Sequence, residues 1–229
     1  GNNFAVGDVN LFYNTIGTNN IAVGALSLPR NTSGSHNIAL GFETMSYNTT
    51  GDNNFALGYQ SLYKNETGGN NIAIGNSAGY DLTSGSNNIL LGNNAQASTT
   101  TMSNQIILGN SSITSLRAQV TSITALSDRR DKTDIVTIAE GIDFIKQLKP
   151  VTFTWNTRDK AKVGIKAAGF IAQDLLTSQK SSSIGDNLDL VSEDNPEKLE
   201  ARYNNLLPVM VKAIQDQQAI IEELKKELE

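Results

Sequence analysis

The first half of the chain repeats one short apolar phrase between polar, glycine-rich segments. The phrase reads roughly Asn-Asn-apolar-Ala-apolar-Gly, and it returns every 17 residues. Its closing glycines are Gly7, Gly24, Gly41, Gly58, Gly75, Gly92 and Gly109. A fixed period of this length is typical of a solenoid, because one short unit cannot bury its own apolar face and must stack on its neighbours.

Each phrase predicts a short β-strand followed by a tight turn. In one copy Ile38 and Leu40 flank Ala39, so the two larger side chains share one face of the strand and the alanine lies on the other. We expect the larger residues to fill a continuous core and the alanine to meet a closely packed neighbour. The glycine after the strand permits a positive φ. Residues 1–110 are therefore predicted to form a β-roll or β-helical fibre.

The asparagines of the phrase are predicted to form hydrogen-bonded ladders between stacked units. Stacked oxygens also suit calcium, but these turns lack the aspartates that a calcium site prefers, so no metal site and no cofactor are predicted. His36 stands where other units have Asn19 or Asn53. We interpret it as a ladder substitution and not as a catalytic base.

The pattern of apolar positions changes in the second half. Residues 111–126 are predicted to form a stalk or linker, and the Ser-, Gly- and Asp-rich segment Thr177–Leu188 a loop. The last helix carries a strict heptad seam, which indicates a coiled coil in which polar Gln217 sets the register. The seam residues are Leu207, Met210, Ile214, Gln217, Ile221, Leu224 and Leu228. The alternative is a single amphipathic helix packed on its own domain.

Composition narrows the chemistry. There is no cysteine and one histidine, which excludes thiolate sites and argues against a Ser-His-Asp triad. The net charge of −5 argues against a nucleic-acid partner, and no apolar run is long enough for membrane insertion. Only seven of the charged side chains lie in residues 1–110, which indicates two domains of different fold.

A charged cluster at the junction holds the candidate chemistry. A serine nucleophile needs a base, and a lysine serves if its pKa is lowered by burial or by neighbouring cations. Ser127 and Lys132 stand five apart, with Arg129 and Arg130 between them. Their spacing alone leaves open whether they meet, and a solvated linker is the simpler interpretation.

The sequence from Ser127 resembles the endosialidase-type intramolecular chaperone of phage tail proteins, the S74 peptidase family. The resemblance rests on Ser-Asp-x-Arg-x-Lys-x-x-Ile at residues 127–135, Leu-Lys-Pro-Val-Thr-Phe-Thr-Trp at 148–155, Gly-Phe-Ile-Ala-Gln-Asp at 169–174 and the helix after Tyr203. It implies an α+β chaperone over residues 127–229 that directs assembly of a homotrimer and then cleaves its own chain once.

The resemblance also implies the roles of single residues. Ser127 is the nucleophile and Lys132 the base of a Ser-Lys autoprotease with one turnover. Asp128 and Arg130 are candidate supporting residues. The cleaved bond is expected to be one beside Ser127, most simply the bond between Leu126 and Ser127.

The repeat phrase itself resembles the head repeats of trimeric autotransporter adhesins and the repeats of phage tail fibres. Together the two resemblances imply the distal part of a phage tail fibre on the virion, with its chaperone made in the host cytoplasm. The partner outside the trimer is a host cell-surface glycan or protein receptor. A bacterial trimeric surface adhesin without proteolysis is the alternative. Five aromatic residues in the turns either stack on a sugar or fill gaps between rungs or chains: Phe42, Tyr47, Tyr59, Tyr63 and Tyr80.

Overall fold

The chain forms two compact units, Gly1–Ser115 and Leu116–Glu229. The computed structural model describes residues 1–119, 125 and 127–228. Part of the predicted stalk therefore lies outside the described residues. No described helix combines the length and apolar character needed to cross a membrane.

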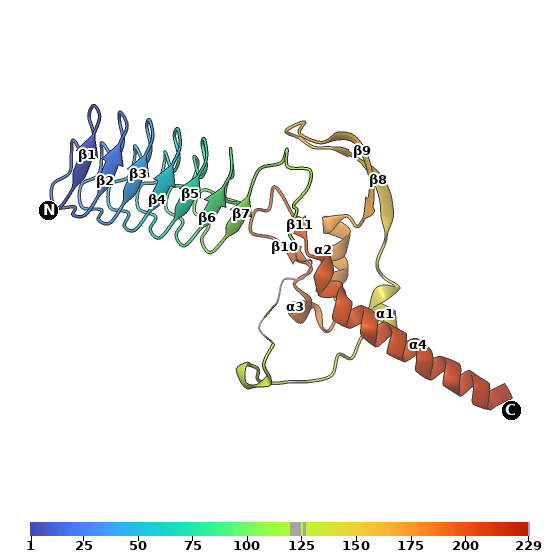
Figure 1. Cartoon of the computed structure of the whole chain (residues 1–229). Helices are drawn as coiled ribbons and strands as arrows, with labels where there is room; N and C mark the ends of the chain where they lie inside the picture. Colours follow the sequence, from blue (N-terminus) through green and yellow to red (C-terminus); the bar gives the residue numbers. More distant parts are fainter. Residues whose placement is uncertain (120–124, 126, 229) are drawn as a thin grey trace. The chain divides into compact units, whose positions relative to one another are not determined.

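The first unit is a parallel β-solenoid. One three-residue strand from each rung joins a single seven-stranded sheet in chain order, and Figure 1 shows the rungs stacked in a row. Every pair is parallel with an offset of 17 residues, as in Phe4↔Ile21 and Ile21↔Ile38. The strands are β1 (Phe4–Val6), β2 (Ile21–Val23), β3 (Ile38–Leu40), β4 (Phe55–Leu57), β5 (Ile72–Ile74), β6 (Ile89–Leu91) and β7 (Ile106–Leu108). The predicted β-helical repeat is confirmed.

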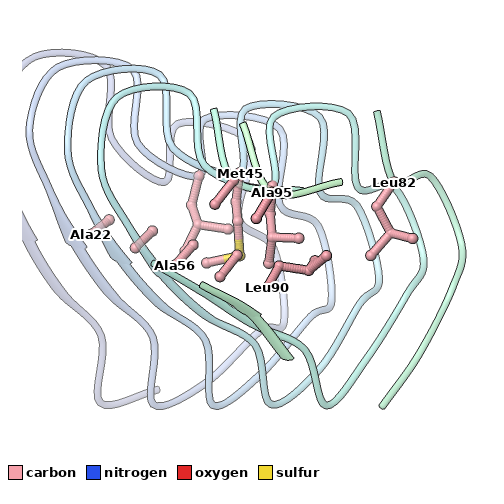
Figure 2. Close-up of a cluster of buried hydrophobic side chains, with 11 residues drawn as sticks. Ala22, Met45, Ala56, Leu82, Leu90 and Ala95 are labelled. Atoms are coloured by element: carbon pink, nitrogen blue, oxygen red, sulfur yellow. The ribbon is translucent and has the colours of Figure 1, made fainter. Parts of the chain in front are cut away.

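The predicted orientation of the strands was wrong. The alanines point into the coil and are fully buried, as Ala22 and Ala56 show in Figure 2, whereas the larger strand residues face outwards. Ile72 is 39% exposed and Leu57 40% exposed. The reason is space inside the coil, where large side chains enter from the segment that follows each strand. Fully buried Leu28, Met45 and Leu62 fill the interior and leave room only for a methyl group from the strand.

One rung shows this exchange of volume directly. Leu28, Met45 and Leu62 occupy the same position in successive units, and the next unit has Gly79 there. The strand that follows Gly79 has Leu90 where the earlier inward positions have alanine. A methyl group added at Gly79 would lie 2.9 Å from Cδ1 of Leu90 and 2.8 Å from Cδ2 of Leu62. Leu90 therefore fills the space that the glycine leaves.

The predicted asparagine ladders are confirmed, and two of the ladders in the described rungs show how they form. In one, the side-chain oxygen of each asparagine accepts a hydrogen bond from the backbone of the asparagine one rung on, as from Asn37 to Asn20 at 2.9 Å. In the other, side chains bond directly, as from Asn48 to Asn31 at 2.8 Å. His36 contacts the Asn19 amide at 3.2 Å and shares its left-handed backbone, with φ of 61° and 58°.

The second unit is a small α+β region that ends in a long helix, as predicted. Its elements are η1 (Arg129–Asp131), α1 (Ile142–Ile145), β8 (Val151–Asn156), β9 (Val163–Gly169), α2 (Ala172–Ser181), α3 (Gly185–Leu188), β10 (Val191–Ser192), β11 (Glu200–Ala201), η2 (Tyr203–Leu206) and α4 (Leu207–Leu228). Strands β8 and β9 form a long antiparallel hairpin, visible in Figure 1 as a curved arm. The loop predicted for Thr177–Leu188 was wrong, because the end of α2 and all of α3 lie there and Leu188 is buried.

The core of this unit forms where α1, α2 and the start of α4 meet. Phe144 and Val209 are fully buried in it. Gly141 allows α1 to approach α4, since a methyl group there would lie 2.7 Å from the backbone nitrogen of Ala213. The amide of Ile142, at the start of α1, donates to the carboxylate of Asp216 on α4 at 3.2 Å.

Candidate functional site

The segment around Ser127 folds as one tight turn. Asp128 precedes the 3-10 helix η1, and its carboxylate caps that helix by accepting from the Arg130 backbone amide at 2.8 Å. The Arg130 guanidinium donates to both oxygens of the same carboxylate, at 3.0 and 2.6 Å. This guanidinium and the backbone bond lower the pKa of Asp128, so the cap stays charged in mild acid.

The turn brings together the two residues that were predicted to react. The backbone amide of Lys132 donates to the Arg129 carbonyl at 3.2 Å, which closes the turn. The Nζ atom of Lys132 then lies 2.6 Å from the Oγ atom of Ser127. This separation allows a proton to pass from the hydroxyl to a neutral amine. Asp128 and Arg130 bond to one another, so their contribution is to shape the turn.

The turn is open to solvent in the single chain. Ser127, Arg129, Arg130 and Lys132 are exposed, and Asp128 is half-buried. A lysine acts as a base near neutral pH only when burial or neighbouring cations lower its pKa. In the single chain the turn supplies no burial of this kind. Leu126, whose carbonyl is the predicted target, lies outside the described residues.

The predicted seam of α4 is exposed along its whole length. Leu207, Ile214 and Leu224 are each more than half exposed, although all are large apolar residues. The other face of the helix packs on the core through Val209 and Ala213, which are buried. The helix therefore presents two apolar faces, of which its own chain covers one. The alternative of an amphipathic helix packed on its own domain accounts for that covered face alone.

The described residues contain no group of three or more histidine, cysteine, aspartate or glutamate side chains that could hold a metal ion. Sequence reasoning missed the capping role of Asp128. The available signal was an aspartate immediately before a short turn, where a carboxylate accepts from the amide two residues on.

Comparison with known families gives one match. The family model described as chaperone of endosialidase, Peptidase_S74, matches residues 127–180. The search of curated proteins gave no match, and neither did the search of solved structures. The match begins at Ser127, the residue whose hydroxyl meets Lys132, and it extends through the β8–β9 hairpin and most of α2. It supports an endosialidase-type intramolecular chaperone in the second unit of this chain.

Proposed function

We propose that this chain is the distal part of a trimeric phage tail fibre, with a C-terminal chaperone that assembles the trimer and then cuts itself off. The observation that carries the proposal is the 2.6 Å contact between Ser127 and Lys132 at the first residue of the chaperone match. A solvated linker has no need of such a contact. In this proposal the protein acts on the virion, after the chaperone has worked in the host cytoplasm.

The reaction is an acyl transfer within one chain. Neutral Lys132 takes the proton of the Ser127 hydroxyl while Oγ attacks the carbonyl carbon of Leu126. The C–N bond between the two residues then breaks, and Lys132 returns the proton to the departing amine of Ser127. Water hydrolyses the resulting ester and frees the serine hydroxyl. Nucleophile and carbonyl belong to adjacent residues, so proximity supplies a large part of the rate.

Two exposed apolar surfaces support a homotrimer. The first is the α4 seam, whose heptad spacing is typical of a helix that packs against copies of itself. The second is the outer face of the solenoid sheet, where Phe4 is 58% exposed and Leu57 40% exposed. Continuous apolar patches of this kind mark interaction surfaces in soluble proteins. Copies of the same chain present matching columns, because every rung has the same register.

Trimer assembly also explains why the cut would come last. Parallel strands that look alike are prone to register errors, and a C-terminal bundle brings three chains together before the rungs pair. Cleavage afterwards removes the part that guided assembly, so the fibre cannot easily return to the unfolded state. Burial of the Ser127 turn in the trimer would supply the environment that the exposed turn lacks, and this delays the reaction until assembly.

The test is the subunit mass on a denaturing gel. Wild type should give two fragments, each close to half of the chain, whereas Ser127→Ala and Lys132→Ala should give the intact 24.6 kDa subunit. Arg129→Ala is the matched control, because it removes an exposed cation from the same turn and should still cleave. Fragments from Ser127→Ala would exclude the serine mechanism, and an uncut wild-type trimer would favour the adhesin alternative.

The solenoid is proposed to be the part that attaches to the host, through a cell-surface glycan or protein receptor. This role is supported by its exposed aromatic side chains, among which Tyr59 is 46% exposed and Phe42 45% exposed.

A further inference from the structure

The hairpin formed by β8 and β9 has two free edges. Among the described residues each of these strands pairs only with the other, so one edge of each strand has no partner strand. A two-stranded hairpin is at best marginally stable by itself in water. Apolar side chains of this one are also partly uncovered, since Trp155 is 39% exposed and Ile165 49% exposed. The hairpin therefore has the character of a sheet that lacks a strand.

The two free edges differ in how well they are protected against a further strand. Natural sheets commonly protect an edge with lysines and bulges. β9 contains Lys166 and Gly164, whose φ is 77°, and its register against β8 shifts by one residue. β8 reads Val-Thr-Phe-Thr-Trp-Asn and contains no charged residue. Its β-branched and aromatic residues favour strand pairing, so the edge of β8 is the one open to an added strand.

Another segment of the same unit has the composition of a strand without forming one. Residues 135–138 read Ile-Val-Thr-Ile, and all four are β-branched. The backbone there is irregular, and residues 133–139 make no backbone hydrogen bond to any other described residue. Ile135 is 53% exposed and Val136 85% exposed. This segment therefore has the properties of an edge strand without a partner.

The segment is bounded by a fixed point on each side. Asp134, immediately before it, has a left-handed backbone with φ of 51°, and Lys132 of the Ser127 turn lies two residues earlier. After the segment, the Glu140 carboxylate accepts hydrogen bonds from the Ser182 hydroxyl and the Ser183 amide, both at 2.8 Å. Residues 135–138 therefore form a short bridge between the reacting turn and the core of the unit.

The charges of the hairpin and of this segment are complementary. Residues 149–169, which include the hairpin, contain five basic side chains and one acidic side chain, a net charge of +4. Residues 131–140 contain three acidic side chains and one basic side chain, a net charge of −2. Opposite charges of this kind steer association and help to fix the register of two surfaces.

The alternation of apolar and polar side chains matches as well. In β8, Phe153 and Trp155 share one face, where their rings meet with centroids 5.1 Å apart, and threonines occupy the other face. In an extended segment, Val136 and Ile138 would share one face and Thr137 would lie on the other. Pairing the apolar faces places Thr137 beside the threonines of β8.

We propose that residues 135–138 of one chain add as a strand to the free edge of β8 in a neighbouring copy. The segment of the same chain is a poorer occupant, because Figure 1 shows it reaching α1 from one side and β8 leaving α1 on another. In a closed ring of three copies each chain gives one strand and receives one. The proposal rests on the homotrimer proposed above, and it adds a contact that holds the Ser127 turn against a second chain.

The experiment is disulfide trapping, which suits a chain without native cysteine. Thr137→Cys is combined in turn with Thr152→Cys, Thr154→Cys and Asn156→Cys in the full chain, and each protein is treated with oxidised glutathione. Cα atoms directly opposite one another in a sheet lie about 4.5–5.5 Å apart, within the range of a disulfide. At least one combination should give covalent dimers and trimers on a denaturing gel that disappear on reduction. Both cysteines follow Ser127, so self-cleavage does not remove the link.

The matched control combines Val136→Cys with the same three partners. A shift of one residue moves a side chain to the opposite face of the strand, so these combinations should link chains at no more than about a tenth of the yield. The proposal is overturned if no Thr137→Cys combination links two chains, if the disulfide forms within one chain, or if the Val136→Cys combinations link equally well.

Two proline variants keep the test decisive if a cysteine variant fails to fold. The N–H groups of adjacent residues in a strand point to opposite edges, so only one of Val136→Pro and Thr137→Pro removes a hydrogen bond to β8. That variant should dissociate at least tenfold more readily than the other in light scattering over a concentration series, and equal behaviour of the two refutes the added strand. A wild type that is oligomeric but forms no link refutes this contact alone, whereas a monomeric wild type refutes the homotrimer as well.

Discussion

Leu90 fills the space that a larger side chain at Gly79 would occupy, and this pairing gives a testable prediction about the solenoid core. The two residues occupy the space that Leu62 and Ala73 share one rung earlier. Leu90→Ala alone should leave a cavity beside Gly79 and lower the free energy of unfolding by about 2–5 kcal/mol. Gly79→Leu alone should overfill the same space, with Leu90 and Leu62 already less than 3 Å from a methyl group there, and cost about 1–3 kcal/mol or more.

The double variant Gly79→Leu/Leu90→Ala should recover most of the loss. It recreates the arrangement of the preceding rung, where Leu62 has a left-handed backbone with φ of 50°, close to the 65° of Gly79. The remaining cost is the strain of a leucine in that region, about 1–2 kcal/mol. If the two substitutions acted independently, their costs in free energy of unfolding would sum to roughly 3–8 kcal/mol. The difference between this sum and the expected cost of the double variant is large enough to measure.

The assay is denaturant unfolding of the four proteins on a Ser127→Ala background, which removes the proposed nucleophile of self-cleavage. The matched control is Ala56→Gly, which removes one inward methyl group on a rung without the exchange and should cost no more than about 1–2 kcal/mol. If the double variant is as unstable as the sum of the two single variants, the two side chains do not share one space and the account of the inverted strand faces fails.

Two further predictions concern the second unit. Ile221→Asp should dissociate the proposed trimer in size-exclusion chromatography with light scattering. Ile220→Asp, which changes an equally exposed isoleucine outside the seam, should leave it intact, and the seam is refuted if both behave alike. The Lys212 ammonium and the Ile142 amide lower the pKa of Asp216. The stability that this carboxylate contributes is therefore complete above about pH 4, and it is lost as the pH falls through the lowered pKa. Asp216→Asn should therefore lose less stability than wild type between pH 5 and strongly acidic pH in chemical unfolding, and identical pH profiles would exclude this linkage.

The sequence predicted the rung and its period but not which face points inwards. The alternation of Ile38, Ala39 and Leu40 assigns the side chains to two opposite faces of the strand. It does not say which of the two faces is buried. The choice depends on Met45 and its equivalents, which enter the coil from another wall and are joined to the strand only by the winding of the chain. That information is tertiary, so a local pattern cannot contain it.

The candidate site was predictable in its residues and not in its geometry. The resemblance identified Ser127 and Lys132, while their contact depends on a turn that Asp128 caps and Arg130 clamps. The helices in Thr177–Leu188 were missed for a related reason. Serine and glycine favour loops in isolation, but burial of Leu188 and the bonds from Ser182 and Ser183 to Glu140 hold this segment against the core.

The uniform register of the solenoid has a consequence for how its length can change. Each rung enters and leaves at equivalent points, since every strand pairs with the next at the same 17-residue offset. An in-frame duplication or loss of one unit would therefore lengthen or shorten the rod by one rung, roughly 4.8 Å, without disturbing the rungs on either side. Recombination between neighbouring copies can in this way adjust the length of the solenoid in small equal steps, while the Ser127 turn and the C-terminal unit stay unchanged.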